Sequence, residues 1–303
     1  MVAQVERHPR EDDEVFVSDL KLFSGGAAAN TAYACGKLGL KSAFIGKLGS
    51  NDTFGFKIVK DFEAANVNTS MIKYSYEQGT GSAYIVLNEE GDRRIYAYSG
   101  AANHLSQDDI NEKEIQSTKI IYLSSLKNIN SFIEAARVGQ KHKIPVILNP
   151  GMLIIDQGYI IIKKLLEQID ILILSLREFQ TLFSNEKMSD MKTLIKKNID
   201  NLFNLGIKAV VVTMGKAGAF LINNVDSEMI QTIPVNNVKD TTGAGDAFSA
   251  GFIYEFIKNT SYYFNDLKKN VKIGNFVAGR CIQKLGARNG LPNREELISE
   301  FFK

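Results

Sequence analysis

The sequence has little of the residues that build disulfide and zinc sites. Its 303 residues include no tryptophan, three histidines and two cysteines. Cys35 and Cys281 lie far apart in the chain, and neither has a His or Cys neighbour at metal-ligand spacing. We therefore expect neither a disulfide framework nor a zinc site, and this cysteine usage fits a reducing cytoplasm.

Long apolar runs and a strong excess of one charge are also absent. No apolar run reaches the roughly 18 residues of a membrane span, and the polar N-terminus lacks the apolar core of a signal peptide. The formal net charge is only +2, and the short lysine runs fall in predicted helices, where solvated faces explain them. We therefore expect a cytoplasmic protein that binds neither membranes nor nucleic acid.

The sequence does contain enough apolar residues for a large α/β core. Hydrophobic residues make up 45% of the chain, and five prolines and no low-complexity segment leave no sign of a linker. Short apolar runs, typical of buried parallel strands, alternate with helical patterns. The predicted strands are 42–45, 119–123, 145–148, 169–174 and 209–213, and the predicted helices include 30–38, 130–142, 158–167 and 192–205. This order predicts a three-layer α/β/α fold with a mostly parallel central sheet.

Two segments break this alternation. Residues 15–23 form one strand pattern, and residues 81–87 with 94–98 form a predicted hairpin. We expect them to build a small antiparallel sheet from about 1–23 and 79–100, inside a single domain that spans 1–303.

The most informative pattern is Asp240-Thr-Thr-Gly-Ala-Gly-Asp246, directly before apolar residues at helical spacing. A helix that begins near Gly243 presents unpaired backbone N–H groups and its positive dipole end, which favour a phosphate. Gly243, Ala244 and Gly245 let such a group approach the backbone closely. Asp246 then stands where it can take a proton. The alternative is an ordinary turn followed by a first-turn acid, and spacing alone does not separate the two.

Gly25 and Gly26 open a second pattern, Gly25-Gly-Ala-Ala-Ala-Asn30. A glycine here lets a substrate approach the backbone, and the Asn30 amide can both donate to and accept from hydroxyl groups. Asn30 could instead cap a helix. Asp52 is expected to order its loop and cap the helix that follows.

These patterns together resemble the two signatures of the ribokinase family, the PfkB carbohydrate kinases. The signatures stand about two hundred residues apart and in the family's order, and equivalents of further motifs follow the first one: Ser175-Leu-Arg-Glu178, Val212-Thr-Met-Gly215-Lys-Ala-Gly218 and Leu285-Gly-Ala-Arg288. The resemblance covers nearly the whole chain. It implies a ribokinase-like fold with a β lid, and transfer of the γ-phosphoryl group of ATP to a hydroxymethyl group of a sugar.

The resemblance also implies residue roles. Asp246 would be the base, the amides of Gly243, Ala244 and Gly245 would hold the transferring phosphoryl group, and Gly25, Gly26 and Asn30 would bind the sugar. The other implied roles are Glu178 acting on Mg²⁺ through water, the nucleotide along Thr213, Gly215 and Gly218 with Asn275 near the adenine, and Asp240 and Thr242 beside a K⁺ ion found in many relatives. Relatives often dimerise through the lid, so a homodimer is expected.

Three departures from the family pattern are visible. The chain starts at Met1-Val-Ala-Gln-Val, so the family's first strand and its sugar-binding Asp are missing from the expected place. Ser175 stands where relatives commonly carry Asn, and Asn149 precedes Pro150 where many have Asp. Two other interpretations therefore stay open, a nucleoside kinase of the same family and a catalytically impaired relative that binds nucleotide or sugar. A Walker-type nucleotide hydrolase is set aside, because no Gly-Lys pair is followed by Ser or Thr.

Overall fold

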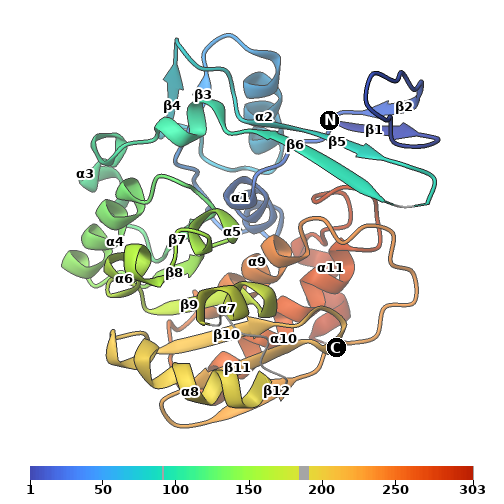
Figure 1. The fold of residues 1–303 in the computed structure, drawn as a ribbon. Helices are drawn as coiled ribbons and strands as arrows, with labels where there is room; N and C mark the ends of the chain where they lie inside the picture. Colours follow the sequence, from blue (N-terminus) through green and yellow to red (C-terminus); the bar gives the residue numbers. More distant parts are fainter. Residues whose placement is uncertain (91, 184–190, 303) are drawn as a thin grey trace.

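Six short strands form the central sheet of the molecule (Figure 1). The computed structural model describes residues 1–90, 92–183 and 191–302. The sheet order is β12-β11-β10-β9-β8-β7, with parallel pairing from β7 to β10 and antiparallel pairing from β10 to β12. The strands are β7 (Ile121–Ser124), β8 (Val146–Asn149), β9 (Ile171–Ser175), β10 (Ala209–Thr213), β11 (Ala219–Asn223) and β12 (Ser227–Ile230).

Helices cover both faces of this sheet, because its strands are apolar on both sides. Leu172 and Leu174 of β9 pack into one core cluster, and Ile171 and Ile173 of the same strand pack into the other. The first cluster lies under α4 (Asn130–His142), α5 (Met152–Ile155), α6 (Tyr159–Leu166), α7 (Leu176–Phe183) and α8 (Met191–Asn204). The second lies under α1 (Ala27–Lys37), α9 (Ala244–Phe256), α10 (Phe264–Cys281) and α11 (Arg294–Phe301). The predicted three-layer fold is confirmed, with four predicted strands matching β7 to β10.

One predicted core strand is wrong. Residues 42–45 carry only an isolated bridge at Ala43, and the strand is instead β3 (Gly46–Gly49). β3 pairs in parallel with β4 (Ile72–Ser75) in a separate two-stranded sheet. Strands β3 and β4 pack against Phe62 of α2 (Thr53–Ala64) in a separate, smaller core cluster. The apolar run 42–45 leads into this small sheet and does not enter the central sheet. Asp52 caps α2 as predicted, because its carboxylate accepts the Gly55 N–H at 2.6 Å.

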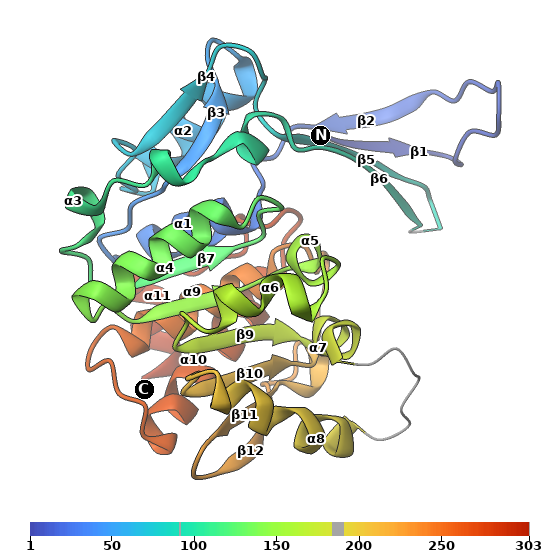
Figure 2. The ribbon, with the colours of Figure 1, turned by 60° about the vertical axis from the view of Figure 1, so that its left-hand side comes forward.

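A four-stranded sheet projects from one side of the molecule (Figure 2). Its order is β2-β1-β5-β6, with bounds β1 (Val2–Val5), β2 (Val17–Lys21), β5 (Ser82–Leu87) and β6 (Arg93–Tyr98). The β5–β6 and β1–β2 pairs are antiparallel, and β1 joins the two pairs by running parallel to β5. The sequence placed residues 1–23 in this sheet but predicted no strand at 2–5, and the parallel pairing of β1 with β5 differs from the antiparallel sheet that was expected.

The remaining elements are short. They are α3 (Glu112–Ile115) and the 3₁₀ turns η1 (Gly100–His104), η2 (Gln107–Asp109) and η3 (Gly215–Ala217).

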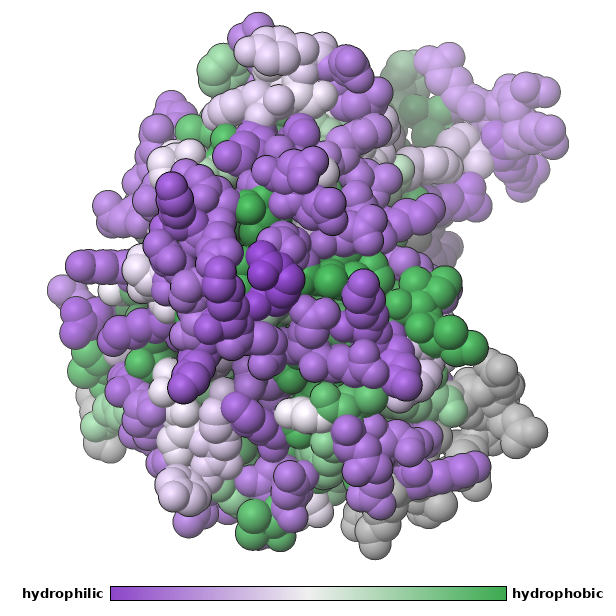
Figure 3. Space-filling view, turned by 90° about the vertical axis from the view of Figure 1, so that its left-hand side faces the viewer, coloured by the Kyte–Doolittle hydropathy of each residue, from purple (hydrophilic) through white to green (hydrophobic). Residues whose placement is uncertain are grey.

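The surface on the side of α4 is polar. Figure 3 shows a mostly hydrophilic face there, with some hydrophobic side chains. Within the described ranges, every helix is too short or too polar to cross a membrane.

Candidate active site

The N-terminal end of α9 is shaped by a glycine that no other residue can replace without strain. Gly243 is the N-cap and has φ +80°, a conformation that favours glycine. A Cβ at this position would lie 2.5 Å from Cβ of Ala287. The helix therefore starts close against the 285–288 segment, and the sequence prediction of its start near Gly243 is confirmed.

The first turn of α9 offers a backbone donor, the Gly245 N–H, to an open space. The Ala244 N–H donates to the Thr241 carbonyl at 3.2 Å and is used in the turn before the helix. Gly245 is exposed, and a Cβ built on it would meet no atom within 4 Å. The Gly245 N–H is therefore the donor that a small anion can approach most closely.

Asp246 follows in the same turn, and its surroundings give its carboxyl group a pKa near neutral pH. The pKa of Asp246 is raised to about 7, mainly by burial and to a smaller extent by the nearby Glu178. The hydrogen bond from Asn30 and the charge of Arg288 act in the opposite direction. A carboxylate with a pKa close to the operating pH is suited to take a proton from a hydroxyl group.

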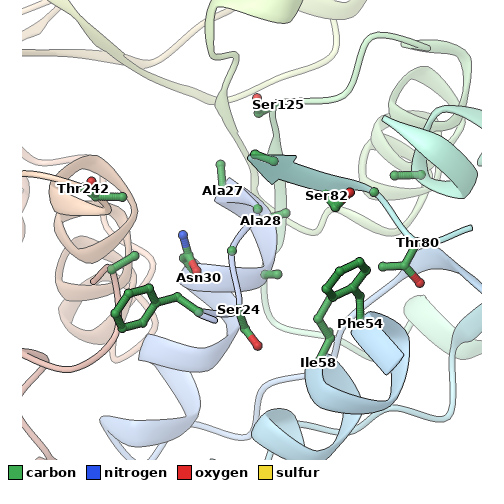
Figure 4. Close-up of a pocket in the computed structure, with 18 of the residues that line it drawn as sticks. Ser24, Ala27, Ala28, Asn30, Phe54, Ile58, Thr80, Ser82, Ser125 and Thr242 are labelled. Atoms are coloured by element: carbon green, nitrogen blue, oxygen red, sulfur yellow. The ribbon is translucent and has the colours of Figure 1, made fainter. Parts of the chain in front are cut away.

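A cavity of about 880 Å³ lies between α1, α2 and the four-stranded sheet. Figure 4 shows that it is lined from several elements, including Asn30 on α1, Phe54 on α2, Ser82 on β5 and Thr242 before α9. The lining contains five residues predicted to bind ligands, namely Gly25, Gly26, Asn30, Asp240 and Thr242. Asp246 is not in the lining, but it joins the cavity wall through Asn30, whose Nδ2 donates to Asp246 Oδ2 at 2.9 Å.

Asn30 is not a helix cap, so that alternative is wrong. Gly26 is the N-cap of α1, and Asn30 lies in the second turn with 5% of its surface exposed. Both ends of its amide have partners, because its Oδ1 also accepts from Arg288 Nε at 2.9 Å. The first signature and the second are therefore joined by a direct hydrogen bond between α1 and α9.

Asp240 and Thr242 hold the segment before α9 against the C-terminal part of the chain. The Asp240 carboxylate accepts from the Thr242 N–H at 2.9 Å and from the Gly286 N–H at 2.8 Å. Cys281 Sγ lies 3.9 Å from the Thr242 carbonyl oxygen and 3.3 Å from that of Ala287. These two carbonyl oxygens and one carboxylate lie in one small region. They are oxygen ligands of the kind that bind a monovalent cation.

Glu178 stands at the start of α7 in a reciprocal pair with Ser175. Its carboxylate accepts from the Ser175 N–H at 2.6 Å, while Ser175 Oγ accepts from the Glu178 N–H at 3.2 Å. Glu178 is also near enough to act on the pKa of Asp246. The carboxylate of Glu178 offers hard oxygen donors of the kind that suit Mg²⁺ and its bound water.

The residues predicted to bind nucleotide lie away from the cavity lining. Thr213 ends β10, and Gly215 and Gly218 flank η3 with φ +55° and +101°. A Cβ on Gly218 would lie 2.1 Å from the Ile230 carbonyl oxygen, so this loop packs tightly on the end of β12. Asn275 is buried and donates to that same carbonyl at 3.1 Å, which supports the wall beside the loop.

No role was predicted from the sequence for three side chains near Asp246. Arg288 reaches it through Asn30, Thr31 Oγ1 donates to the Asp246 backbone carbonyl at 3.3 Å, and the Tyr122 hydroxyl lies 3.4 Å from Thr31 Oγ1. Arg288 directly follows the Gly286-Ala287 pair of a recognised motif, so its position was a signal. Tyr122 lies in an apolar strand pattern that offers no such signal.

Comparisons with known proteins agree with this geometry. A family model described as pfkB family carbohydrate kinase matches residues 1–294. A ribokinase of Staphylococcus aureus is 31% identical over 296 residues, covering 97% of this chain and 93% of that protein. An uncharacterized sugar kinase of Archaeoglobus fulgidus is 33% identical over 259 residues, covering 84% and 97%. The structure of Arabidopsis thaliana ribokinase complexed with ribose and ATP superimposes with a TM-score of 0.86 at 26% identity, covering 98% of this chain and 94% of that one.

Proposed function

Because this chain belongs to the pfkB family of carbohydrate kinases and is an ATP-dependent kinase, we propose that it phosphorylates a hydroxymethyl group of a sugar, with Asp246 as the base. The observation that carries this proposal is the hydrogen bond between Asn30 and Asp246. It joins a cavity wall of small residues to a carboxylate at the mouth of α9. Sugar hydroxyl, base and phosphoryl group would thus meet at one point.

The residues of the α9 mouth divide the work of the transfer. Asp246 accepts the proton of the attacking hydroxyl, which makes the oxygen a better nucleophile. The backbone at Gly243, Ala244 and Gly245 surrounds the transferring phosphoryl group, with the Gly245 N–H as its closest donor and the helix dipole favouring its negative charge. Little covalent chemistry is asked of the protein, since phosphoryl transfer depends mainly on positioning and charge stabilisation.

ATP is the phosphoryl donor, and we propose that its base and ribose lie along Thr213, Gly215 and Gly218, with Asn275 beneath them. Glu178 would hold Mg²⁺ through water, and the Asp240 and Thr242 region would hold K⁺. These ions, when bound, neutralise charge on the phosphates and strengthen the anion hole. A cytoplasmic location, where ATP is abundant, belongs to the same proposal.

On the acceptor side, Gly25 and Gly26 leave the backbone open to a sugar. Ribokinases of Staphylococcus aureus and Arabidopsis thaliana are among the relatives of this chain, which favours a pentose or a similar sugar over a nucleoside. The direct test is ADP release from Mg-ATP with ribose, 2-deoxyribose, fructose, adenosine and inosine, with and without K⁺. Release stimulated by one sugar supports the proposal. Stimulation by a nucleoside alone would replace it, and no release from a folded, ATP-binding protein would contradict it.

The pH dependence of turnover follows from the pKa of Asp246. A base must be deprotonated, and burial raises the pKa of this carboxyl to about 7. We expect kcat/KM to fall about tenfold per pH unit below pH 7 and to level off above it, because kcat/KM reports the free enzyme. Initial rates from pH 5 to 9 in buffers of constant ionic strength measure this limb. A profile that stays flat down to pH 5 would contradict the assignment.

We also propose that the four-stranded sheet is a lid on one domain spanning 1–303 and the surface of a homodimer. Val2, Ser82 and Ile85 of this sheet line the cavity. Large exposed side chains lie on both faces of this sheet, since Ile95 (53% exposed) and Tyr96 (62%) are neighbours on β6, and Leu20 at 59% and Tyr98 at 50% are exposed as well. An apolar sheet of this kind is typical of a surface covered by another chain.

Substitution of one lid residue tests the dimer. Ile95→Asp places a charge in the middle of edge strand β6 and is expected to convert the dimer to monomer in sedimentation velocity runs. Ile161→Asp is the matched control, because Ile161 is similarly exposed, at 56%, but lies on α6. A wild-type protein that sediments only as monomer at working concentration would remove the dimer.

A further inference from the structure

Arg288 is a buried cation with little to pair with. Only 8% of it is exposed, and its guanidinium carbon lies 4.8 Å and 5.6 Å from the ring centroids of Tyr33 and Phe62. Neither Nη1 nor Nη2 has a hydrogen-bond partner within the described part of the chain. The nearest carboxylate, Asp61, lies 3.8 Å from Nη1, beyond hydrogen-bond distance, and it is also held by Lys57 at 3.1 Å. Burying a charge in this way is costly, so a structural salt bridge does not explain it.

Within the described residues, the one hydrogen bond that the Arg288 side chain makes points toward the active site. Its Nε donates to Asn30 Oδ1 at 2.9 Å, and Asn30 Nδ2 donates to Asp246 Oδ2 at 2.9 Å. Arginine can only donate, so the oxygen of the Asn30 amide has to face Arg288. The amide nitrogen then has to face Asp246. The opposite orientation would place an amide oxygen against the carboxylate and would turn the Asn30 nitrogen toward the Arg288 donor.

We propose that Arg288 is a positioning residue: its Nε fixes the Asn30 amide in the orientation that donates to Asp246, which holds the base charged and aligned for the acceptor hydroxyl. This inference rests on the proposed role of Asp246 as the base. The donated hydrogen bond occupies Oδ2 and leaves the other carboxylate oxygen for the incoming hydroxyl. Asn30 thus acts within the protein, whatever it also contributes to sugar binding.

Other groups around Asp246 do not supply this effect. Glu178, at the start of α7, is negative and disfavours the charged form of Asp246. Tyr122 on β7 and Cys281 on α10 are both neutral, since burial raises the pKa of each to about 12. Arg288 is the cation that acts on this carboxylate within the described residues. Its removal therefore has no evident substitute.

Three substitutions separate the donor of Arg288 from its charge. Gln places an amide nitrogen where Arg carries Nε, so Arg288→Gln keeps the donor without the charge. Lys places a methylene there, so Arg288→Lys keeps the charge without that donor, and Arg288→Met keeps neither. We expect the acidic limb of the kcat/KM profile to move up by about one pH unit in the Met variant, which loses both donor and charge, by less in Lys and by least in Gln. Their activity relative to wild type should recover between pH 7 and 9.

A matched control and a second readout complete the test. Arg280→Gln removes an α10 arginine whose nearest carboxylate is Glu300 at 3.5 Å, and it should leave the limb in place. The second readout is the pH dependence of the free energy of unfolding, measured for chains with Asp246 and with Asp246→Asn, each with and without Arg288→Lys. Arg288→Lys should change this pH dependence through the charge of Asp246, and the comparison needs no turnover.

The outcomes distinguish the two proposals. The positioning role would be overturned if the acidic limb of Arg288→Lys lay at or below the pH of the Arg288→Gln limb. It would also be overturned if the variants lost the same fraction of activity at every pH. The comparison of Arg288→Lys with Arg288→Gln decides even where Arg288→Met does not fold. If the wild-type chain releases no ADP with any acceptor, the proposed function fails. The unfolding comparison then still decides whether Arg288 controls the charge of Asp246: a pH dependence left unchanged by Arg288→Lys overturns the positioning role.

Discussion

Asp246→Asn is expected to fold, bind ATP and lose turnover by roughly 10²- to 10⁴-fold, which is the range that a positioned general base contributes. The substitution keeps the shape of the side chain and an oxygen that can accept from Asn30 Nδ2, so the cavity wall should not change. It removes only the ability to take a proton. The expected signature is a fall in kcat with little change in the Kd for ATP.

The same variant should be more stable than wild type at high pH. The folded-state pKa of Asp246 is raised to about 7, above its unfolded value of 3.8, so the charged form is disfavoured by folding. The penalty is complete above pH 7 and disappears as the pH falls through the unfolded value of 3.8, below which both states are protonated. We expect a gain on the order of 2 kcal/mol at pH 8 that vanishes near pH 4.

Two measurements check this pair of effects on one protein. ADP release gives the loss of turnover, and urea unfolding at pH 4.5, 6 and 8 gives the change in free energy of unfolding. Turnover near that of wild type would remove Asp246 from the role of base. A stability gain that is the same at all three pH values would instead show that its cause is not the charge of this carboxyl group.

Gly245→Ala is expected to lose turnover by roughly 10²- to 10³-fold while the fold stays intact, because its methyl group would keep the phosphoryl group away from the N–H of residue 245, an effect comparable to loss of one anion-hole donor. Gly245 has no positive φ, and an added Cβ would meet no protein atom within 4 Å. Alanine should even stabilise the helix by about 0.5 kcal/mol, because glycine loses more backbone entropy. The methyl group would occupy the space in which we place the phosphoryl group.

Gly243→Ala is the contrasting variant for this experiment. Its Cβ would lie 2.5 Å from Cβ of Ala287, at φ +80°, so this change should lower the melting temperature. Circular dichroism melting and ADP release are measured on both variants. Full activity in a folded Gly245→Ala protein would mean that the phosphoryl group binds elsewhere.

The sequence was most informative where chemistry depends on neighbouring residues. Gly243 and Asp246 are three residues apart, so the start of α9 and the place of the carboxylate in its first turn follow from local spacing. The central strands were equally readable, since runs such as Ala209–Thr213 are apolar on both faces. The run 42–45 misled because an apolar segment looks alike in a central strand and in the segment before β3.

Only the tertiary structure could decide how distant residues meet. Asn30 and Asp246 are 216 positions apart, and Arg288 is 258 positions from Asn30, yet they form one chain of hydrogen bonds. A linear pattern shows which groups can donate or accept, but not which partner each one faces.

By itself, then, the sequence determined the α/β class, the start of α9 and the place of Asp246 in its first turn. The environment of Asp246 was decided by the packing of α1 against α9. This packing shields Asp246 from water and so raises its pKa, and the Asn30 amide links Arg288 to Asp246. Desolvation and hydrogen-bond direction are properties of the assembled fold, so they arise only when these segments come together.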